Sequence, residues 1–209
     1  MESSKKIKNA WAGYSKKGEE HLNLERKWAA QNYKILKRLG VVPCKKILDI
    51  GCSHGFFLKI CKQNGIEING IDVDPEIIDG KTVKKCNVET DKFPFKDNTF
   101  DVVFSSGLVQ HLNKPPINFM EEIYRVLKPN GKLAMHVRNE KSWINILFSL
   151  YDNFRHKSVW SPMSLEQMFE YYKFKIITMQ PKFLGLSWLW WVPFKWHIGS
   201  NIVVIGQKT

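Results

Sequence analysis

The segment KILDIGCSHGFF, which runs from Lys46 to Phe57, constrains the fold of this chain more than any other stretch. Its first part, KILDI, is typical of a short strand that is buried on both faces. Glycines at positions 51 and 55 then predict a tight turn whose backbone can approach a ligand closely. A helix is expected to begin at Phe56, with its first free N–H groups directed at the same spot. Strand, turn and helix in this order favour an α/β fold with a ligand site at the turn.

An acidic residue, Asp49, lies just before the first glycine of the turn. A fixed negative charge at this position disfavours a pyrophosphate, which helix N-termini otherwise bind well. It suits a cationic or zwitterionic ligand instead. Together with the absence of a complete Gly-x-Gly-x-x-Gly pattern, Asp49 argues against a nicotinamide-dependent oxidoreductase.

The pattern Asp49-x-Gly51-x-Ser53-x-Gly55 resembles the first motif of class I S-adenosylmethionine (SAM) dependent methyltransferases. Glycine usually takes the place of Ser53 in that motif. The resemblance implies that SAM is the cofactor, with S-adenosylhomocysteine as its product, and that these four residues bind it. It also implies a Rossmann-like, doubly wound α/β sheet of seven strands, mostly parallel with a C-terminal antiparallel strand.

A second strand is expected around Ile68–Ile71, and it ends at Asp72. In doubly wound folds an acidic residue about 20 residues past the glycine turn accepts hydrogen bonds from ribose hydroxyls. The nucleoside half of SAM carries the same vicinal diol, so we expect Asp72 to bind it. Asp74, beside Pro75, is expected to serve as a turn or cap residue.

A brief third strand is expected within the segment Lys84–Thr90, closed by Asn87 and Val88. In the methyltransferases that this chain resembles, an acidic residue followed by a small apolar one holds the adenine at this place. Asn87 stands at the acidic position, where a side-chain amide can still pair with the adenine edge. The resemblance therefore implies that Asn87 and Val88 contact the cofactor.

A buried strand from Phe100 to Phe104 is expected next, followed by Ser105, Ser106 and a helical turn that carries His111. Ligands in open α/β sheets bind beyond the carboxyl ends of the strands. Four polar residues fall at or just beyond such ends: Asp49, Asp72, Asn87 and Ser105. We therefore expect these residues to converge on one cofactor site.

The segment Arg125–Gly131 (RVLKPNG) reproduces the "R-x-L-K-P-x-G" element of one branch of the resembling family. This is the small-molecule, ubiquinone-biosynthesis-like branch, and the resemblance to it covers residues 46–137. The role of the element is structural: Pro129 is expected to end a helix and Gly131 to allow the turn into a fifth strand. The resemblance implies a methyltransferase that acts on a small or lipid-like acceptor.

Methyl transfer from a sulfonium depends mainly on holding the acceptor and the methyl carbon close and aligned. A general base is needed only when the acceptor must lose a proton. His111 is the candidate for that catalytic role, with packing or loop fixing as the alternative. His136, inside the predicted fifth strand, is less favoured. Arg138 is placed to meet an anionic substrate or to form a surface ion pair.

The chain is predicted to divide into an N-terminal helical lid, residues 1–45, and a SAM-binding domain, residues 46–209. Within the lid, a helix from Asn23 to Leu39 is expected to bury one face formed by Trp28, Ala29, Asn32, Leu36 and Leu39. Substrate-side insertions are expected at about 139–172 and 181–199. A helix from Ser164 to Tyr172, with Ser164 as its N-cap, and strands at 175–179 and 201–207 are expected near the end of the chain.

The net charge of +12 is concentrated in the flanks, since residues 1–46 contain twelve basic and four acidic groups. Basic surfaces suit anionic headgroups, phosphorylated metabolites or RNA, or simply keep a protein in solution. Four tryptophans gather in residues 183–198, at positions 188, 190, 191 and 196. They indicate hairpin packing, an apolar substrate pocket or peripheral membrane contact. An RNA methyltransferase and a catalytically silent, methyltransferase-like binding protein stay open as alternatives.

The chain opens with a polar, lysine-rich segment and without an apolar run, so a cytoplasmic location is expected. Its four cysteines form no Cys-x-x-Cys pair, which predicts reduced thiols and no bound metal.

Overall fold

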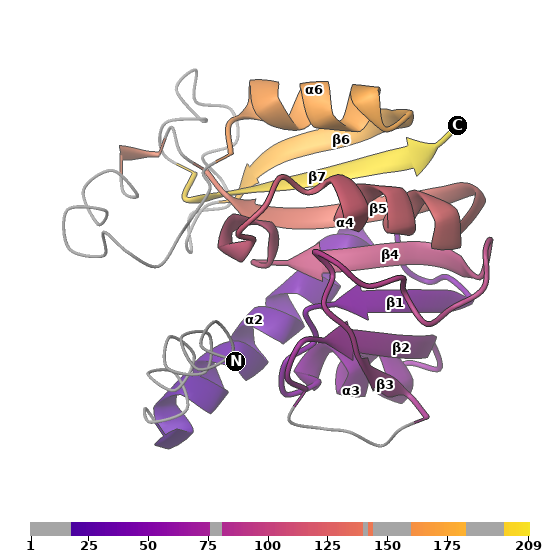
Figure 1. Cartoon of the computed structure of the whole chain (residues 1–209). Helices are drawn as coiled ribbons and strands as arrows, with labels where there is room; N and C mark the ends of the chain where they lie inside the picture. The colour runs from indigo at the N-terminus through magenta and orange to yellow at the C-terminus, as the bar shows by residue number, and fades with distance from the viewer. Residues whose placement is uncertain (1–17, 76–80, 140–141, 144–159, 183–198) are drawn as a thin grey trace.

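The structure is a computed structural model of the 209-residue chain, and it describes residues 18–75, 81–139, 142–143, 160–182 and 199–209. Within these ranges one seven-stranded sheet has the order β3-β2-β1-β4-β5-β7-β6 (Figure 1). The strands are β1 (Lys46–Ile50), β2 (Glu67–Asp72), β3 (Val83–Lys85), β4 (Phe100–Ser106), β5 (Leu127–Arg138), β6 (Phe174–Lys182) and β7 (Asn201–Lys208). The helical elements are α2 (Gly18–Arg38), α3 (Phe56–Gln63), the 3-10 helix η1 (Val109–His111), α4 (Ile117–Val126) and α6 (Pro162–Tyr171).

The sheet is doubly wound, as predicted. β1 pairs in parallel with both β2 and β4, and β5 pairs in parallel with β4. β7 is antiparallel to its two neighbours, β5 and β6, and so completes the predicted antiparallel end of the sheet. The chain builds outward from β1 to β3 and then returns to add β4 on the other side of β1. Ligands bind at such a switch point in open α/β sheets.

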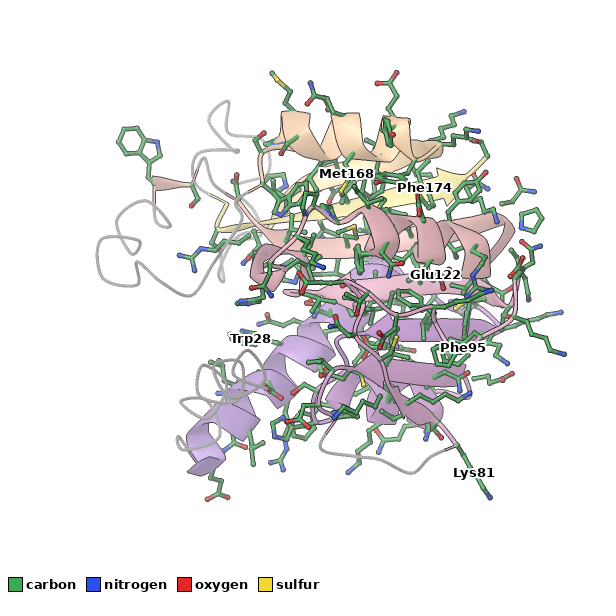
Figure 2. The ribbon with its side chains drawn as sticks, viewed as in Figure 1. Trp28, Lys81, Phe95, Glu122, Met168 and Phe174 are labelled. Atoms are coloured by element: carbon green, nitrogen blue, oxygen red, sulfur yellow. The ribbon has the colours of Figure 1, made fainter. Side chains whose placement is uncertain are left out.

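Helices cover both faces of the sheet (Figure 1). On one face, α4 and α6 pack over the sheet through Phe119, Ile123, Leu165 and Phe169. On the other face, α2 and α3 pack through Leu36, Phe57, Leu58 and Cys61. Met168 and Phe174, labelled in Figure 2, belong to the core beneath α6. The result is a three-layer arrangement whose two apolar cores are separated by the sheet.

The central position of β1 in the sheet explains why its sequence is mostly apolar. Ile47, Leu48 and Ile50 are all fully buried, because β1 lies in the centre of the sheet with helices on both sides. Leu48 and Ile50 belong to the core under α4 and α6, whereas Ile47 belongs to the core under α2 and α3. Since side chains alternate along a strand, Asp49 shares the face of Ile47.

The connection between α4 and β5 is structural, as predicted for the RVLKPNG segment, but its details differ. α4 ends at Val126, and Leu127 is already extended, because the residues before a proline avoid the helical region. The positive φ of the turn, 62°, falls on Asn130 rather than on Gly131. Gly131 is required for space instead, since a Cβ atom there would lie 2.8 Å from the carbonyl oxygen of Lys128.

Arg125 fastens this connection to the loop that precedes β4. Its guanidinium donates to the carbonyl oxygens of Phe93 and Phe95, at 3.0 and 2.8 Å, and to the carboxylates of Asp97 and Glu122. Burial raises the pKa of the Glu122 carboxyl, but hydrogen bonds from the Arg125 guanidinium and from the Phe93 amide hold it below its ordinary value. A planar fork with five donors suits this set of acceptors, which a lysine would not match.

The helix near the end of the chain begins earlier than predicted. The N-cap of α6 is Ser161, and Ser164 is the N3 residue rather than the cap. The Ser161 hydroxyl accepts from the Ser164 amide at 3.1 Å, and the Ser164 hydroxyl accepts from the Ser161 amide at 2.9 Å. Pro162 occupies the first helical position, where its missing N–H costs nothing. The strands predicted for 175–179 and 201–207 are present as the antiparallel pair β6 and β7.

α2 begins at Gly18, five residues before the start predicted for it. Ala29, Asn32 and Leu36 lie on its buried face, as predicted, but Trp28 does not, since 43% of its surface is exposed (Figure 2). Helical spacing explains the difference, because the buried positions 29, 32 and 36 turn position 28 outward. The tryptophan group 188–196, the rest of the predicted insertions and residues 1–17 lie outside the described residues.

Candidate functional site

The loop between β1 and α3 is a compact turn with three residues in the left-handed region. Gly51, Ser53 and Gly55 have φ values of 79°, 45° and 69°. The amide of Gly51 donates to the carbonyl oxygen of Ile71 in β2 at 2.8 Å, which ties the loop to the neighbouring strand. The strained serine at position 53 occupies the place where the resembling motif usually has glycine.

Asp72, the last residue of β2, is hydrogen-bonded to this loop. One carboxylate oxygen accepts from the backbone amide of Ser53 at 2.9 Å, and the other accepts from the amide of Asp74 at 3.0 Å. The side chain is half-buried at the carboxyl end of its strand. Each oxygen of an ionised carboxylate has two lone pairs, so Asp72 can accept further hydrogen bonds from a ligand diol.

Asp49 lies below the loop and is only 4% exposed. Burial raises the pKa of its carboxyl to about 8, and the nearby charge of Asp72 adds to the rise. In the protein without a bound cation, burial therefore opposes the negative charge that the sequence predicts for Asp49. A cation bound nearby would favour its ionised form.

The segment after β3 forms a turn rather than the last part of a strand. β3 ends at Lys85, so the strand stops two residues before Asn87, which was predicted to close it together with Val88. The side-chain oxygen of Asn87 accepts from the amide of Glu89 at 3.0 Å, and its backbone oxygen accepts from the amide of Asp91 at 2.8 Å. Asparagine favours such turns because its side chain replaces a backbone partner.

Val88 and Glu89 connect this turn to the segment after β4. Val88 is buried, and its carbonyl oxygen accepts from the Asn118 side chain at 2.9 Å. The Glu89 carboxylate accepts from the backbone amides of Asn113 and Lys114 and from the Asn113 side chain. The segments that follow β3 and β4 are therefore held as one unit, although they are about 25 residues apart.

The end of β4 lies beside the loop of β1. Ser105 is 2% exposed and pairs in register with Ile50, whereas the next residue, Ser106, is half-buried. Leu108 approaches the loop from this side, since a Cβ atom on Gly51 would lie 3.4 Å from the Leu108 side chain. A short helical turn, η1, follows and ends with the half-buried His111.

Helix α2 contacts the loop and adds residues that the sequence analysis did not assign to the site. Glu25 Oε2 lies 2.8 Å from His54 Nδ1, and the Ser53 hydroxyl lies 3.0 Å from the same nitrogen. The guanidinium of Arg26 stands over the Phe56 ring, 5.0 Å from its centre. Helix and loop are thus joined by an ion pair when His54 is protonated, and by a cation–π contact.

A second polar contact joins α2 to the ends of β4 and β5. Asn32 Nδ2 donates to Ser106 Oγ at 3.0 Å, and Ser106 Oγ lies 3.1 Å from His136 Nδ1. Asn32 appears in the sequence only as a polar residue on an otherwise apolar helix face. That position was the available signal, because a buried asparagine requires hydrogen-bond partners.

The predicted site residues thus fall into three groups. Gly51, Ser53, Gly55 and Asp72 form one hydrogen-bonded unit, with Asp49 buried nearby. Ser105 lies on the next strand of the sheet, while Asn87 and Val88 follow β3 on the other side of β2. His111 is on the segment after β4, and Arg138 is the last residue of β5.

These residues fit SAM better than a pyrophosphate-containing nucleotide. The Asp72 carboxylate accepts from the backbone of the loop, where its charge would repel a bound phosphate. Asp72 is held by two backbone amides and retains capacity for a diol. Among the described residues, no group of three or more histidine, cysteine or acidic side chains is arranged to hold a metal ion.

Comparison with known proteins agrees with this assignment. Residues 48–135 match the sequence profile of a family described as "Methyltransferase domain". The chain is 36% identical over 111 residues to cycloartenol-C-24-methyltransferase 1 of Oryza sativa subsp. japonica, with 47% of this chain and 32% of that protein covered. It is 31% identical over 118 residues to phosphoethanolamine N-methyltransferase 2 of Caenorhabditis elegans, with 50% and 26% covered. The chain thus spans about a third or less of these relatives.

A solved structure shares the fold over most of both chains. It is a SAM-dependent methyltransferase from Archaeoglobus fulgidus, with a TM-score of 0.66 and 22% sequence identity. The match covers 86% of this chain and 94% of that one. The matched profile thus identifies residues 48–135 as a methyltransferase domain of the class I, SAM-dependent kind, and the solved structure shows that the same fold extends over most of the chain.

Proposed function

We propose that this chain binds SAM at the carboxyl ends of its parallel strands and transfers the methyl group to a small or lipid-like acceptor. The hydrogen bond between Asp72 and the Ser53 amide carries this proposal, because it joins a carboxylate suited to the ribose diol with the glycine turn in one unit.

The cofactor contacts that we propose follow the geometry. Asp72 would accept from the ribose hydroxyls, and the turn formed by Gly51, Ser53 and Gly55 would let the backbone approach the amino-acid half. The oxygen of the Asn87 side chain is already engaged with Glu89, so a hydrogen bond to adenine would come from Nδ2. Val88 would pack on the base, and Asp49 and Ser105 complete the proposed set.

SAM, when bound, would supply a methyl carbon bonded to a sulfonium sulfur, which would leave as the neutral thioether S-adenosylhomocysteine. The task of the protein is to hold the acceptor in line with that carbon and to exclude water, for which positioning alone contributes several orders of magnitude in rate. The site therefore requires a covered space more than it requires charged catalysts. α2, joined to the loop through Glu25 and to β4 through Asn32, would provide the cover. We propose it as the described part of the predicted lid, residues 1–45.

The names of the relatives support a small or lipid-like acceptor, since one indicates a sterol and the other phosphoethanolamine. The excess of positive charge in residues 1–46 would favour an acceptor with an anionic group. No helix among the described residues is long and apolar enough to cross a membrane. We keep peripheral membrane contact and a cytoplasmic location as proposals.

Calorimetry with SAM and S-adenosylhomocysteine tests the cofactor assignment. Asp72→Ala should weaken the binding of both about ten- to a hundredfold, the worth of one or two hydrogen bonds to a charged group. Asp74→Ala is the matched control, because Asp74 is an exposed acidic residue two positions away whose backbone amide, rather than its side chain, contacts Asp72. Wild-type protein that binds neither compound would refute the proposed function.

Activity is tested by incubating the protein with SAM that carries a labelled methyl group and with lipid, quinone, sugar and RNA extracts. Label in a lipid, quinone or sugar fraction supports the proposed acceptor class. Label in RNA that disappears at high salt would instead support an RNA methyltransferase. SAM binding without transfer to any fraction would favour a silent binding protein.

A further inference from the structure

Helix α2 presents two neighbouring stripes of side chains that differ in exposure. Ala29, Asn32 and Leu36 are buried, and Glu25 on the same stripe contacts the cofactor loop through His54. Positions 24, 28, 31 and 35 repeat this helical spacing one residue earlier and form a second stripe. We call this second stripe the uncharged flank, and it consists of Leu24, Trp28, Gln31 and Ile35.

The uncharged flank exposes two large apolar side chains. Leu24 is 42% exposed and Trp28 is 43% exposed. From position 26 onward, every other exposed side chain of α2 beside Trp28 and Gln31 is basic, namely Arg26, Lys27, Lys34, Lys37 and Arg38. A single exposed apolar residue is ordinary, but two large ones one turn apart on a stripe without charge form an apolar surface. Such a surface favours contact with an apolar molecule over contact with a polar metabolite or a nucleic acid.

The flank faces away from α3. The guanidinium of Arg26 stands over Phe56, at the start of α3, and Tyr33 packs against the core to which α3 belongs. Positions 26 and 28 are about 200° apart around a helix of 3.6 residues per turn. Trp28 therefore lies on the side of α2 opposite to α3.

The opposite side is the one toward β5. α3 lies over β2, since a Cβ atom on Gly70 would be 3.2 Å from Leu58. α2 reaches β4 through the hydrogen bond from Asn32 to Ser106, on the other side of β1. With α3 toward β2, the uncharged flank is directed toward β5, the next strand after β4. Figure 2 shows Trp28 on the side of α2 toward the strand ends.

Trp28 lies between the two points at which α2 is held to the site. It is three residues after Glu25, which meets the cofactor loop, and four residues before Asn32, which meets the end of β4. At 1.5 Å per residue, these points are about 5 Å and 6 Å from Trp28 along the helix axis. A ligand of an open α/β sheet binds beyond the carboxyl ends of the strands. A molecule that packs on Trp28 would therefore lie beside the proposed SAM site.

We propose that the uncharged flank is one wall of the acceptor site and that Trp28 selects acceptors with an apolar body. The inference rests on the proposed function and narrows its acceptor class to molecules that carry a hydrocarbon chain or a fused ring system. The exposed 43% of Trp28 is roughly 100 Å² of surface, and covering it raises affinity about ten- to a hundredfold. Trp28 contributes to acceptor binding and takes no part in the bonds that form and break.

The first test measures the kinetics of methyl transfer to the extract fraction that wild-type protein labels. Trp28→Ala should raise the KM for the acceptor about ten- to a hundredfold and leave kcat within about threefold, because the lost contact is the same in the ground and transition states. Trp28→Phe should restore most of the affinity, since an aromatic surface is kept. Leu24→Ala should raise the KM to a smaller extent, because it removes less apolar surface.

Tyr171→Ala is the matched control for these variants. Tyr171 is also an aromatic residue of a helix, is 79% exposed and is the last residue of α6, so its loss should leave both kinetic constants unchanged. The affinity for SAM, measured by calorimetry, should equal that of wild type in all four variants, which also shows that each of them folds. An equal rise of KM in Tyr171→Ala would show a general effect of removing surface aromatics and would overturn the inference.

The second test uses unbranched primary alcohols from butanol to octanol as inhibitors of the same reaction. Each added methylene should tighten the inhibition of wild type about fourfold, the worth of one buried CH₂ group. In Trp28→Ala the tightening per methylene should be smaller, whereas Tyr171→Ala should match wild type. The same dependence on chain length in wild type and Trp28→Ala would contradict the assignment of Trp28 to the acceptor site.

The outcomes separate this inference from the proposed function. Absence of SAM binding, absence of transfer or transfer to RNA alone would defeat both. Label confined to a sugar fraction would retain the proposed function and overturn the inference, as would transfer to lipid or quinone that Trp28→Ala leaves unchanged. Gel filtration tests whether a second copy covers the flank. A wild-type dimer that becomes a monomer in Trp28→Ala with unchanged kinetics would assign the flank to an interface between two chains and overturn the inference.

Discussion

Asp49 has an ionisation that follows from its surroundings rather than from its sequence motif. Its carboxyl is 4% exposed between a central strand and the helices α2 and α3, and burial raises its pKa to about 8. An ordinary aspartate in an unfolded chain titrates near 3.8. The folded protein therefore binds this proton more tightly than the unfolded chain. The stability that the protonated form provides is complete below about pH 4 and is lost as pH rises through about 8.

Asp49→Asn should remove this loss. Between about pH 4 and pH 8 the free energy of unfolding of wild type should fall by up to roughly 1.4 kcal/mol per pH unit from this group, and that of the variant should not. The difference in urea midpoint between variant and wild type should therefore grow with pH in favour of the variant. A constant difference across this range would show that Asp49 is ionised in the folded protein.

Calorimetry on the same variant separates stability from cofactor binding. If Asp49 also serves the cofactor, as we propose, Asp49→Asn should be more stable at pH 7 and bind SAM more weakly. A variant that gains stability and loses binding is common where a buried charged group serves function.

The sequence predicted that Asp72 and the glycine turn would lie together, as the hydrogen bond from the Ser53 amide shows, but it did not predict the contacts of the turn with α2. Asp72 could be predicted because its distance from the glycine turn follows from the length of one strand–helix–strand unit. The pairing of Asn32 with Ser106 spans 74 positions and depends on how α2 crosses the sheet, which no local pattern encodes. The cap of α6 was wrongly predicted at Ser164, although the sequence contains the signal for Ser161, since Pro162 favours the first position of a helix.

At the scale of elements, α2 is held to the site by contacts at two separated points. Its buried positions, including Ala29 and Leu36, pack on the same core as α3. Glu25 meets the loop through His54, with side chains that are 20% and 21% exposed. The part of α2 near Glu25 extends past the edge of the sheet where the strands β1 and β4 end (Figure 1). Among the described residues of α2, the buried apolar ones are Ala29 and Leu36, so the polar pair at Glu25 should govern how often this part of α2 opens.

Glu25→Gln should therefore loosen α2 without unfolding the protein. The hydrogen bond to a charged partner is worth about 1–2 kcal/mol, so amide hydrogen exchange near Glu25 should accelerate about tenfold, while exchange in α3 and β1 stays slow. Glu19→Gln is the matched control, because it makes the same change at an exposed position of the same helix. Equal exchange in wild type and Glu25→Gln would show that other contacts hold the helix.

At the scale of the whole molecule, the last strand in the chain lies inside the sheet and not at its edge. β7 separates β5 from β6 and pairs with both along its length. Lys208, at its end, also donates to the carbonyl oxygens of Tyr124 and Leu127, each at 2.7 Å, where α4 ends. Residues late in the sequence thus complete the core over α4 and α6, to which Ile202 and Val204 belong.

Removal of residues 200–209 should therefore abolish cooperative folding. Without β7, the edge of β5 would be unpaired and β6, with α6 above it, would have no partner strand. Circular dichroism during heating should show no sharp transition, and gel filtration should show aggregates. Removal of Thr209 alone is the control, and it should lower the midpoint only slightly. A sharp transition in the shorter chain would show that the five strands β3 to β5 fold alone.

The general architecture was predictable because the strand, turn and helix motifs occur in a fixed order in this fold. The two faces of the sheet could be assigned from alternation along β1, where Leu48 and Ile50 face one core and Ile47 the other. The place of β7 between β5 and β6 was not predicted, since the pattern of a strand does not name its neighbours; the resemblance to the family implied only that the C-terminal strand is antiparallel.

The hydrogen bond from the Ser53 amide to Asp72 couples the two parts of the site that would bind the nucleoside half and the amino-acid half of SAM. A nucleoside that fixes the carboxylate would also fix the turn that meets the amino-acid half, and the reverse holds as well. Adenosine and methionine, offered as separate fragments, would then bind with positive cooperativity, each raising the affinity for the other by the same factor. Intact SAM would then bind with a free energy more favourable than the sum of the free energies of the two fragments bound separately.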